Sequence, residues 1–194
     1  MLNFAHDTLN CTYLDAEHDV DLAPMVLGSQ SQGLTVVELA GAYTIFNDGK
    51  FTTPHYWTEI YDSDGNLYLD NSKRITTVQA IDPSTATIMN RLLRGVFVGG
   101  TASGLTPSAG GMEAVGKTGT TTDNKDYTFV GLTPYYVTSL RCGYDTPYDM
   151  TKVSSSASTI LKKAWKSYME MVQGDLEPKS FPYSENVVRA AYCT

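Results

Sequence analysis

The chain has 194 residues, of which 42% are hydrophobic and 18% are charged, and its formal net charge is −7. This length fits one domain or a large piece of one, and no stretch approaches the roughly 20 apolar residues that cross a membrane. The acidic balance argues against nucleic-acid binding, which requires a basic surface.

Cysteine and histidine give no sign of a metal or cofactor site. Cys11, Cys142 and Cys193 are widely spaced, and no Cys-x-x-Cys pair occurs. The three histidines lie in unrelated surroundings, so we expect no metal and no cofactor. Cys11 and Cys193 both lie near chain ends, and the sequence leaves open whether they pair. Residues 1–7 lack the basic start and the apolar core of a signal peptide.

Weak patterning marks residues 1–33, which end in a polar loop bounded by glycines. A helix is then predicted from Thr35, because Thr35 and Glu38 have the spacing of a capping box. Asp48-Gly49 is expected to end that helix. Residues 56–61 and 67–69, joined by a turn at 62–65, predict a β-hairpin.

A second helix is predicted from Asp82-Pro83, since proline suits the first helical position. Its expected buried stripe consists of Ile88, Met89, Leu92, Leu93, Val96 and Phe97. A glycine-rich loop over 101–112 follows, and then three antiparallel strands are predicted at 113–120, 127–133 and 135–144.

The last predicted element is a long helix that ends at Gly174. Its expected buried positions are Ala157, Ile160, Leu161, Ala164, Trp165, Tyr168, Met169 and Val172. The predicted fold class is therefore α+β, with an antiparallel sheet flanked by helices.

The segment Lys117-Thr118-Gly119-Thr120 carries the clearest chemical pattern. A lysine on a strand, followed by hydroxyls and a glycine, offers positive charge and hydrogen-bond donors beside a backbone that a ligand can approach closely. An extended peptide can add to such an edge as an extra strand, with its terminal carboxylate at Lys117. A solvated turn is the alternative interpretation of the tripeptide taken alone.

The surroundings of this segment resemble the third motif of bifunctional (class A) penicillin-binding proteins. The matching residues here are Gly116–Thr121, then Lys125-Asp126 and Phe129–Pro134. Other stretches agree in the same order, between about residues 22 and 146: Leu27-Gly28-Ser29, Gly33-Leu34-Thr35, Glu38–Tyr43, Phe46–Lys50, Pro54, Arg74, Leu92–Val96, Gly100-Thr101-Ala102 and Gly143-Tyr144-Asp145. Thr128 departs from the family, which usually has an aromatic residue after Lys-Asp-x.

The resemblance implies a serine enzyme with a five-stranded antiparallel sheet, of the penicillin-binding and serine β-lactamase type. Such enzymes attack the D-Ala-D-Ala end of peptidoglycan stem peptides, form an acyl-enzyme and transfer the acyl group to another stem, and β-lactams trap the serine. It also implies that Lys117 and Thr120 are catalytic, the N–H of Thr120 being an oxyanion donor. Thr118, Gly119, Thr120 and Thr121 are expected to bind substrate. The intact protein is expected on the extracytoplasmic face of the bacterial cell membrane, with its anchor outside this chain.

The nucleophile motif of that family is missing, because Ser-x-x-Lys occurs nowhere in the chain. Thr159-Ile160-Leu161-Lys162 has the spacing, but it lies on the terminal helix, where periodicity explains it. Ser184-Glu185-Asn186 fits Ser-x-Asn but follows Lys-Thr-Gly, whereas in the family it precedes it. We therefore expect a fold that is incomplete at its N-terminal side and a chain that is inactive alone.

The resulting expectation is a partial transpeptidase domain over residues 1–174 and a C-terminal tail over 175–194. Stem peptides and β-lactams are the partners expected of the intact domain, and a bare sheet edge favours self-association. The alternative is a serine-less domain that binds peptidoglycan or senses β-lactams. A β-lactamase fits less well, because 77 residues follow Lys117 (194 minus 117), and an unrelated globular protein remains a further alternative.

Overall fold

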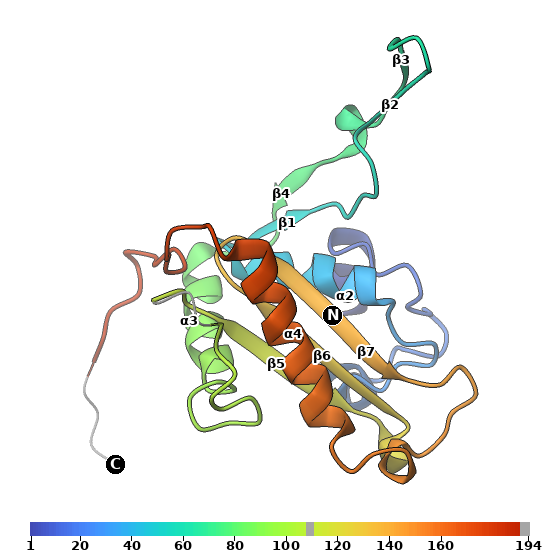
Figure 1. Ribbon diagram of the computed structural model, residues 1–194, viewed down its shortest axis with the longest axis vertical. Helices are drawn as coiled ribbons and strands as arrows, with labels where there is room; N and C mark the ends of the chain where they lie inside the picture. The colour runs from blue at the N-terminus through green and yellow to red at the C-terminus, as the bar shows by residue number, and fades with distance from the viewer. Residues whose placement is uncertain (108–110, 191–194) are drawn as a thin grey trace. The chain divides into compact units, whose positions relative to one another are not determined.

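The computed structural model describes residues 1–107 and 111–190, which form parts of two compact units. Unit 1 consists of Met1–Ile45 and Lys50–Ala80, and unit 2 of Phe46–Gly49 and Ile81–Thr194. The elements in chain order (Figure 1) are η1 (Phe4–Thr8), α1 (Leu22–Leu27), α2 (Val36–Tyr43), η2 (Thr44–Phe46), β1 (Lys50–Thr52), β2 (Glu59–Tyr61), β3 (Leu67–Asp70), η3 (Ser72–Arg74), β4 (Thr77–Gln79), α3 (Pro83–Arg94), β5 (Val115–Thr120), η4 (Thr122–Asn124), β6 (Asp126–Leu132), β7 (Val137–Gly143), η5 (Met150–Lys152) and α4 (Ala157–Gln173).

In unit 1, the predicted capping box at the start of α2 is confirmed. The Thr35 hydroxyl accepts from the Glu38 amide at 3.1 Å, and the Glu38 carboxylate accepts from the Thr35 amide at 2.9 Å. The α-helix ends at Tyr43 and continues as a 3₁₀ turn, in which the backbone N–H of Thr44 donates to the Gly41 carbonyl. The Thr44 hydroxyl donates to the same carbonyl at 2.7 Å. The expected stop at Asp48-Gly49 lies beyond that turn.

The carboxylate of Glu38 also fastens the N-terminal segment to α2. It accepts from the backbone amide of Thr12 at 2.7 Å and from the Thr12 hydroxyl at 2.8 Å, in addition to both donors of Thr35. Burial alone would raise the pKa of Glu38, but the four hydrogen bonds outweigh it, so the pKa lies below its ordinary value of 4.5. A buried, ionised carboxylate therefore holds residues 12 and 35 together.

The predicted hairpin of unit 1 is confirmed as the antiparallel pair β2–β3, and β1 pairs with β4 in a second antiparallel ribbon. The weakly patterned residues 1–33 contain η1 and α1. Cys11 in this segment is 1% exposed, and burial followed by the nearby charge of Glu38 raises the pKa of its thiol to about 11. Cys193, its candidate partner, lies outside the described residues.

Unit 2 is built on the predicted three-stranded antiparallel sheet, in the order β5-β6-β7. Helix α4 lies across this sheet (Figure 1) and contributes Trp165, which is fully buried. The Trp165 ring lies over Gly131 of β6, where a Cβ atom would overlap the ring. Phe97 and Phe129 contact the same ring, with centroids 5.5 and 5.2 Å away. The α+β class is confirmed.

The predicted buried stripes of the two long helices are partly wrong. On α3, Ile88 and Leu92 are exposed, whereas Thr87 and Asn90 face inward. On α4, Ile160, Ala164 and Tyr168 are exposed, whereas Lys162 and Gln173 are buried. Each inward polar side chain has one specific hydrogen bond: Asn90 donates to Phe46 O at 2.7 Å, Lys162 to Thr101 O at 2.6 Å, and Thr133 to Gln173 Oε1 at 2.9 Å. These bonds offset part of the cost of burial, although Asn90 Oδ1 and Gln173 Nε2 have no partner among the described residues.

Residues 175–190 follow α4 without regular structure and pack against the rest of unit 2. Glu113 is the main anchor: its amide donates to Lys179 O at 3.1 Å, and its carboxylate accepts from the Phe181 amide at 3.0 Å. Phe181 is buried, and the Ser184 amide donates to the Thr87 hydroxyl at 3.0 Å. The division into a domain of residues 1–174 and a tail of 175–194 stays a prediction.

Within residues 1–107 and 111–190, no helix combines the length and the apolar character that crossing a bilayer requires.

Candidate functional site

The Lys-Thr-Gly segment lies in the second half of β5, at one edge of the three-stranded sheet. Lys117 and Thr120 are exposed, and Thr118 and Gly119 are partly exposed. The predicted site residues 117–120 therefore lie next to one another on one accessible strand, which pairs with β6.

The pairing register decides which backbone groups of β5 are free. The Thr121 amide donates to Asp126 O at 3.1 Å, so residue 121 is bonded toward β6. Bonding toward a neighbour alternates along an antiparallel strand, and the N–H groups of Thr118 and Thr120 therefore point away from β6. The Lys117 ammonium donates to the Thr118 carbonyl at 2.9 Å, which agrees with that carbonyl lying at the open edge.

Gly119 has a steric reason that the sequence did not show. A Cβ atom at this position would overlap the Thr128 hydroxyl of the paired strand. Thr128 is the residue that departs from the family pattern, and its hydroxyl occupies the space beside Gly119. The group that approaches the Gly119 backbone closely is thus the Thr128 side chain of β6, on the sheet face opposite to the Thr118 side chain.

Thr121 closes the turn between β5 and β6. Its hydroxyl accepts from the Asp126 amide at 2.8 Å, while its own amide donates to Asp126 O. Asp123 and Asn124 in this turn have φ of 61° and 54°, the left-handed values that Asp and Asn tolerate best among residues with a side chain. A role of Thr121 in substrate binding stays a prediction.

The two motif-like segments outside β5 lie on α4 and in the residues that follow it. Thr159 is exposed on α4, and Lys162 three residues later is buried, with its ammonium on the Thr101 carbonyl. The expectation that Ile160 faces the core is wrong, since its side chain is 57% exposed. Ser184 accepts from the Asn186 amide at 3.3 Å in a local turn of the tail.

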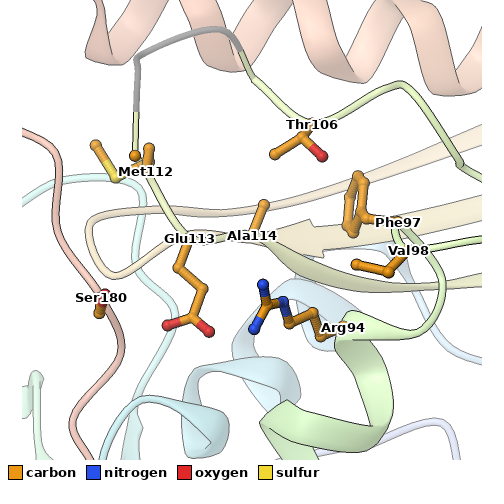
Figure 2. Close-up of a pocket in the computed structure, with 9 residues that line it drawn as sticks. Arg94, Phe97, Val98, Thr106, Met112, Glu113, Ala114 and Ser180 are labelled. Carbon is orange, nitrogen blue, oxygen red and sulfur yellow. The ribbon is translucent and has the colours of Figure 1, made fainter.

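A cleft of about 390 Å³ lies beside the start of β5 (Figure 2). The Arg94 guanidinium from the end of α3 and the Glu113 carboxylate point into the same space, and Phe97 and Val98 lie on the same side as Arg94 (Figure 2). The described residues that line it are Arg94, Phe97, Val98, Thr106, Gly111, Met112, Glu113, Ala114 and Ser180. The Lys-Thr-Gly residues do not line this cleft; they lie further along β5 on its open edge.

Comparison with known proteins identifies the family. Residues 23–146 match the family model of the penicillin-binding protein transpeptidase domain, which covers more than half of the chain. The chain belongs to this family. It is 36% identical over 158 residues to penicillin-binding protein 1A of Neisseria meningitidis serogroup A, and 33% identical over 156 residues to penicillin-binding protein 1A of Clostridium perfringens. The match covers 79% and 80% of this chain but only 20% and 18% of those relatives.

Solved structures show the same fold. Penicillin-binding protein 1A from Haemophilus influenzae matches with a TM-score of 0.75 at 18% identity, over 97% of this chain and 33% of that one. Penicillin-binding protein A from M. tuberculosis, solved as an imipenem acyl-enzyme complex, matches with a TM-score of 0.60 at 14% identity, over 87% of this chain and 41% of that one. The expected penicillin-binding fold is confirmed, with three strands in the described sheet where the resemblance implies five.

Proposed function

We propose that this chain carries the Lys-Thr-Gly wall of the active site of a peptidoglycan D-Ala-D-Ala transpeptidase, and corresponds to the C-terminal part of its transpeptidase domain. The observation that carries the proposal is the open edge of β5, where the N–H groups of Thr118 and Thr120 point away from β6 beside Lys117. Membership of the transpeptidase family supports the same assignment.

In this proposal β5 is the strand along which a stem peptide lies. The peptide adds to the free edge, and its terminal carboxylate meets Lys117 and the hydroxyls of Thr118 and Thr120. The N–H of Thr120 is directed to the place where an oxyanion would develop, and it is one of the two donors such a hole needs. Serine and the second donor belong to motifs that this sequence lacks, so the chain alone cannot form an acyl-enzyme.

The experiment uses the whole chain and the peptide diacetyl-L-Lys-D-Ala-D-Ala, followed by amide chemical shifts. We expect shifts confined to residues 117–121, with a Kd on the order of 1 mM because only one wall of the site is present. Lys117→Met should weaken binding about tenfold, since a charge-assisted hydrogen bond is lost. The L-Ala-L-Ala peptide is the stereochemical control. Equal changes in amide chemical shift with both peptides would contradict the proposal.

Fluorescent penicillin separates this function from the serine-less alternative. We expect no labelled band on a denaturing gel, because Ser-x-x-Lys is absent. A labelled band would contradict the assignment of the nucleophile to another part of the protein. Reversible binding of penicillin or stem peptide in the micromolar range would instead favour a domain that binds or senses without turnover. An in-frame Ser-x-x-Lys in the coding sequence upstream of Met1 would support the transpeptidase.

We further propose that the chain self-associates through the outer edge of β7. By the same alternation, Val137, Ser139, Arg141 and Gly143 turn their backbone groups away from β6, and no described strand pairs with them. Such an edge templates pairing with a second copy. We expect concentration-dependent dimers in light scattering. Ser139→Pro, which removes one edge N–H, should shift them to monomers, whereas Ser139→Ala should not. A wild-type chain that stays monomeric at high concentration would contradict this proposal.

For the intact protein, we propose the extracytoplasmic face of the bacterial cell membrane, where peptidoglycan stems are cross-linked.

A further inference from the structure

Lys162 is a buried lysine on the inner face of α4. Its residue surface is 9% exposed, and its ammonium donates to the Thr101 carbonyl at 2.6 Å. The ion pairs found among the described residues do not include it. Burying an ammonium without a carboxylate is costly, so a lysine kept on this face must gain from the group that it contacts. That group is the backbone at Thr101.

The Thr101 backbone is held in place from three sides. Gly100 before it has no room for a Cβ atom, which would overlap the Gly95 carbonyl or lie 2.8 Å from the Val96 Cα. Ala102 after it is 1% exposed, packs in the core of unit 2, and donates its amide to Val96 O at 2.9 Å. Lys162 supplies the third constraint at the carbonyl. The loop therefore presents the exposed Thr101 side chain in a fixed direction.

The Thr101 side chain contacts β5, the strand along which the stem peptide is proposed to lie. The hydroxyl oxygens of Thr101 and Thr118 lie 3.2 Å apart, within hydrogen-bond distance. A threonine hydroxyl has one proton and two acceptor lone pairs. When Thr101 donates to Thr118, the proton of Thr118 is left free to point toward a ligand along β5.

We propose that Lys162 and Thr101 are positioning residues, which fix the side-chain rotamer of Thr118 and the direction of its hydroxyl proton. The chain of contacts runs from the Lys162 ammonium to the Thr101 carbonyl, and from the Thr101 hydroxyl to Thr118. The inference rests on the proposed function, since Thr118 is the residue assigned to the stem-peptide carboxylate. It gives a role to the lysine of the Thr-x-x-Lys spacing, which acts through the backbone rather than on a nucleophile.

The test reads the Thr118 rotamer directly, in the full chain without ligand. The three-bond N–Cγ coupling of Thr118 should show a single rotamer in the wild type. It should move to an averaged value in Thr101→Val, which is nearly isosteric, and in Lys162→Met, which keeps the apolar stem. Thr101→Ser, which keeps the hydroxyl, and Lys163→Met, at the exposed neighbouring lysine, should retain the wild-type coupling. An unchanged coupling in Thr101→Val overturns the inference even if Lys162→Met fails to fold.

Peptide affinity gives the second, separable measurement. Thr101→Val should bind diacetyl-L-Lys-D-Ala-D-Ala about fivefold more weakly than the wild type, and Thr101→Ser should bind within about twofold. Equal binding by Thr101→Val and the wild type would also overturn the inference. A wild type that binds no peptide would remove the proposed function, while the coupling would still decide whether Thr101 and Lys162 position Thr118.

Discussion

Trp165→Ala should lower the free energy of unfolding of unit 2 by about 3–5 kcal/mol. The indole is fully buried against Phe97 and Phe129 and lies directly on the backbone at Gly131. Its Nε1 has no hydrogen-bond partner in the described structure, so the loss is one of packing and of the cavity left behind. The cost is large because the sheet beneath it cannot collapse into the space.

Urea denaturation followed by circular dichroism measures this effect, since the variant loses its buried fluorophore. Tyr168→Ala is the matched control, because Tyr168 is on the same helix and is 45% exposed. It should change the free energy of unfolding by less than about 1 kcal/mol. Equal effects of the two variants would mean that α4 does not pack through Trp165.

Glu38→Gln should lower the free energy of unfolding of unit 1 by about 2–3 kcal/mol at pH 7. The amide keeps one acceptor oxygen but places an NH₂ group against donors of Thr12 or Thr35. Glu59→Gln is the control, as Glu59 is exposed and accepts from the Tyr61 hydroxyl. Urea denaturation monitored by the amide cross-peaks of α2 reports unit 1 by itself. A cost equal to that of the control would contradict the role of Glu38.

The same substitution has a defined pH dependence. Because the pKa of Glu38 is lowered on folding, ionised Glu38 contributes stability above the ordinary pKa of 4.5, and the contribution is lost as pH falls through the lower folded value. The pKa values of Asp15 and Asp19 are also lowered by hydrogen bonds, but both residues are present in both proteins. The difference between wild type and Glu38→Gln should therefore shrink below pH 4.5. A difference that stays constant down to pH 2 would contradict this assignment.

Local signals predicted the elements of this fold well. The capping box at Thr35, the hairpin around residues 62–65 and the helix that ends before Gly174 all depend on short-range chemistry, and all are confirmed. Which face of a helix is buried was harder to predict, because it depends on distant partners. Asn90 and Lys162 face inward because carbonyls at Phe46 and Thr101 receive them, and no periodicity contains that information.

Some features of the candidate site could likewise be predicted from the sequence, and others could not. The order of Lys117, Thr118, Gly119 and Thr120 was readable because it lies on one strand, and the short connections predicted the sheet order. The direction of the free N–H groups required the register at Thr121 and Asp126. The link from Lys162 to Thr118 spans 44 residues (162 minus 118) and passes through a third segment, so no local pattern could show it.

The contacts of residues 175–190 can form only late in the synthesis of this chain. The hydrogen bonds of this segment join residues 68 and 97 positions apart, from Phe181 to Glu113 and from Ser184 to Thr87. A ribosome synthesises Glu113 well before Phe181, so Glu113 leaves the exit tunnel before its hydrogen-bond partner does. Glu113 lies just before β5. Its amide and carboxylate therefore have no partner until Lys179 and Phe181 have been synthesised. The start of β5 therefore gains these hydrogen bonds only after α4 and the residues that follow it have left the exit tunnel.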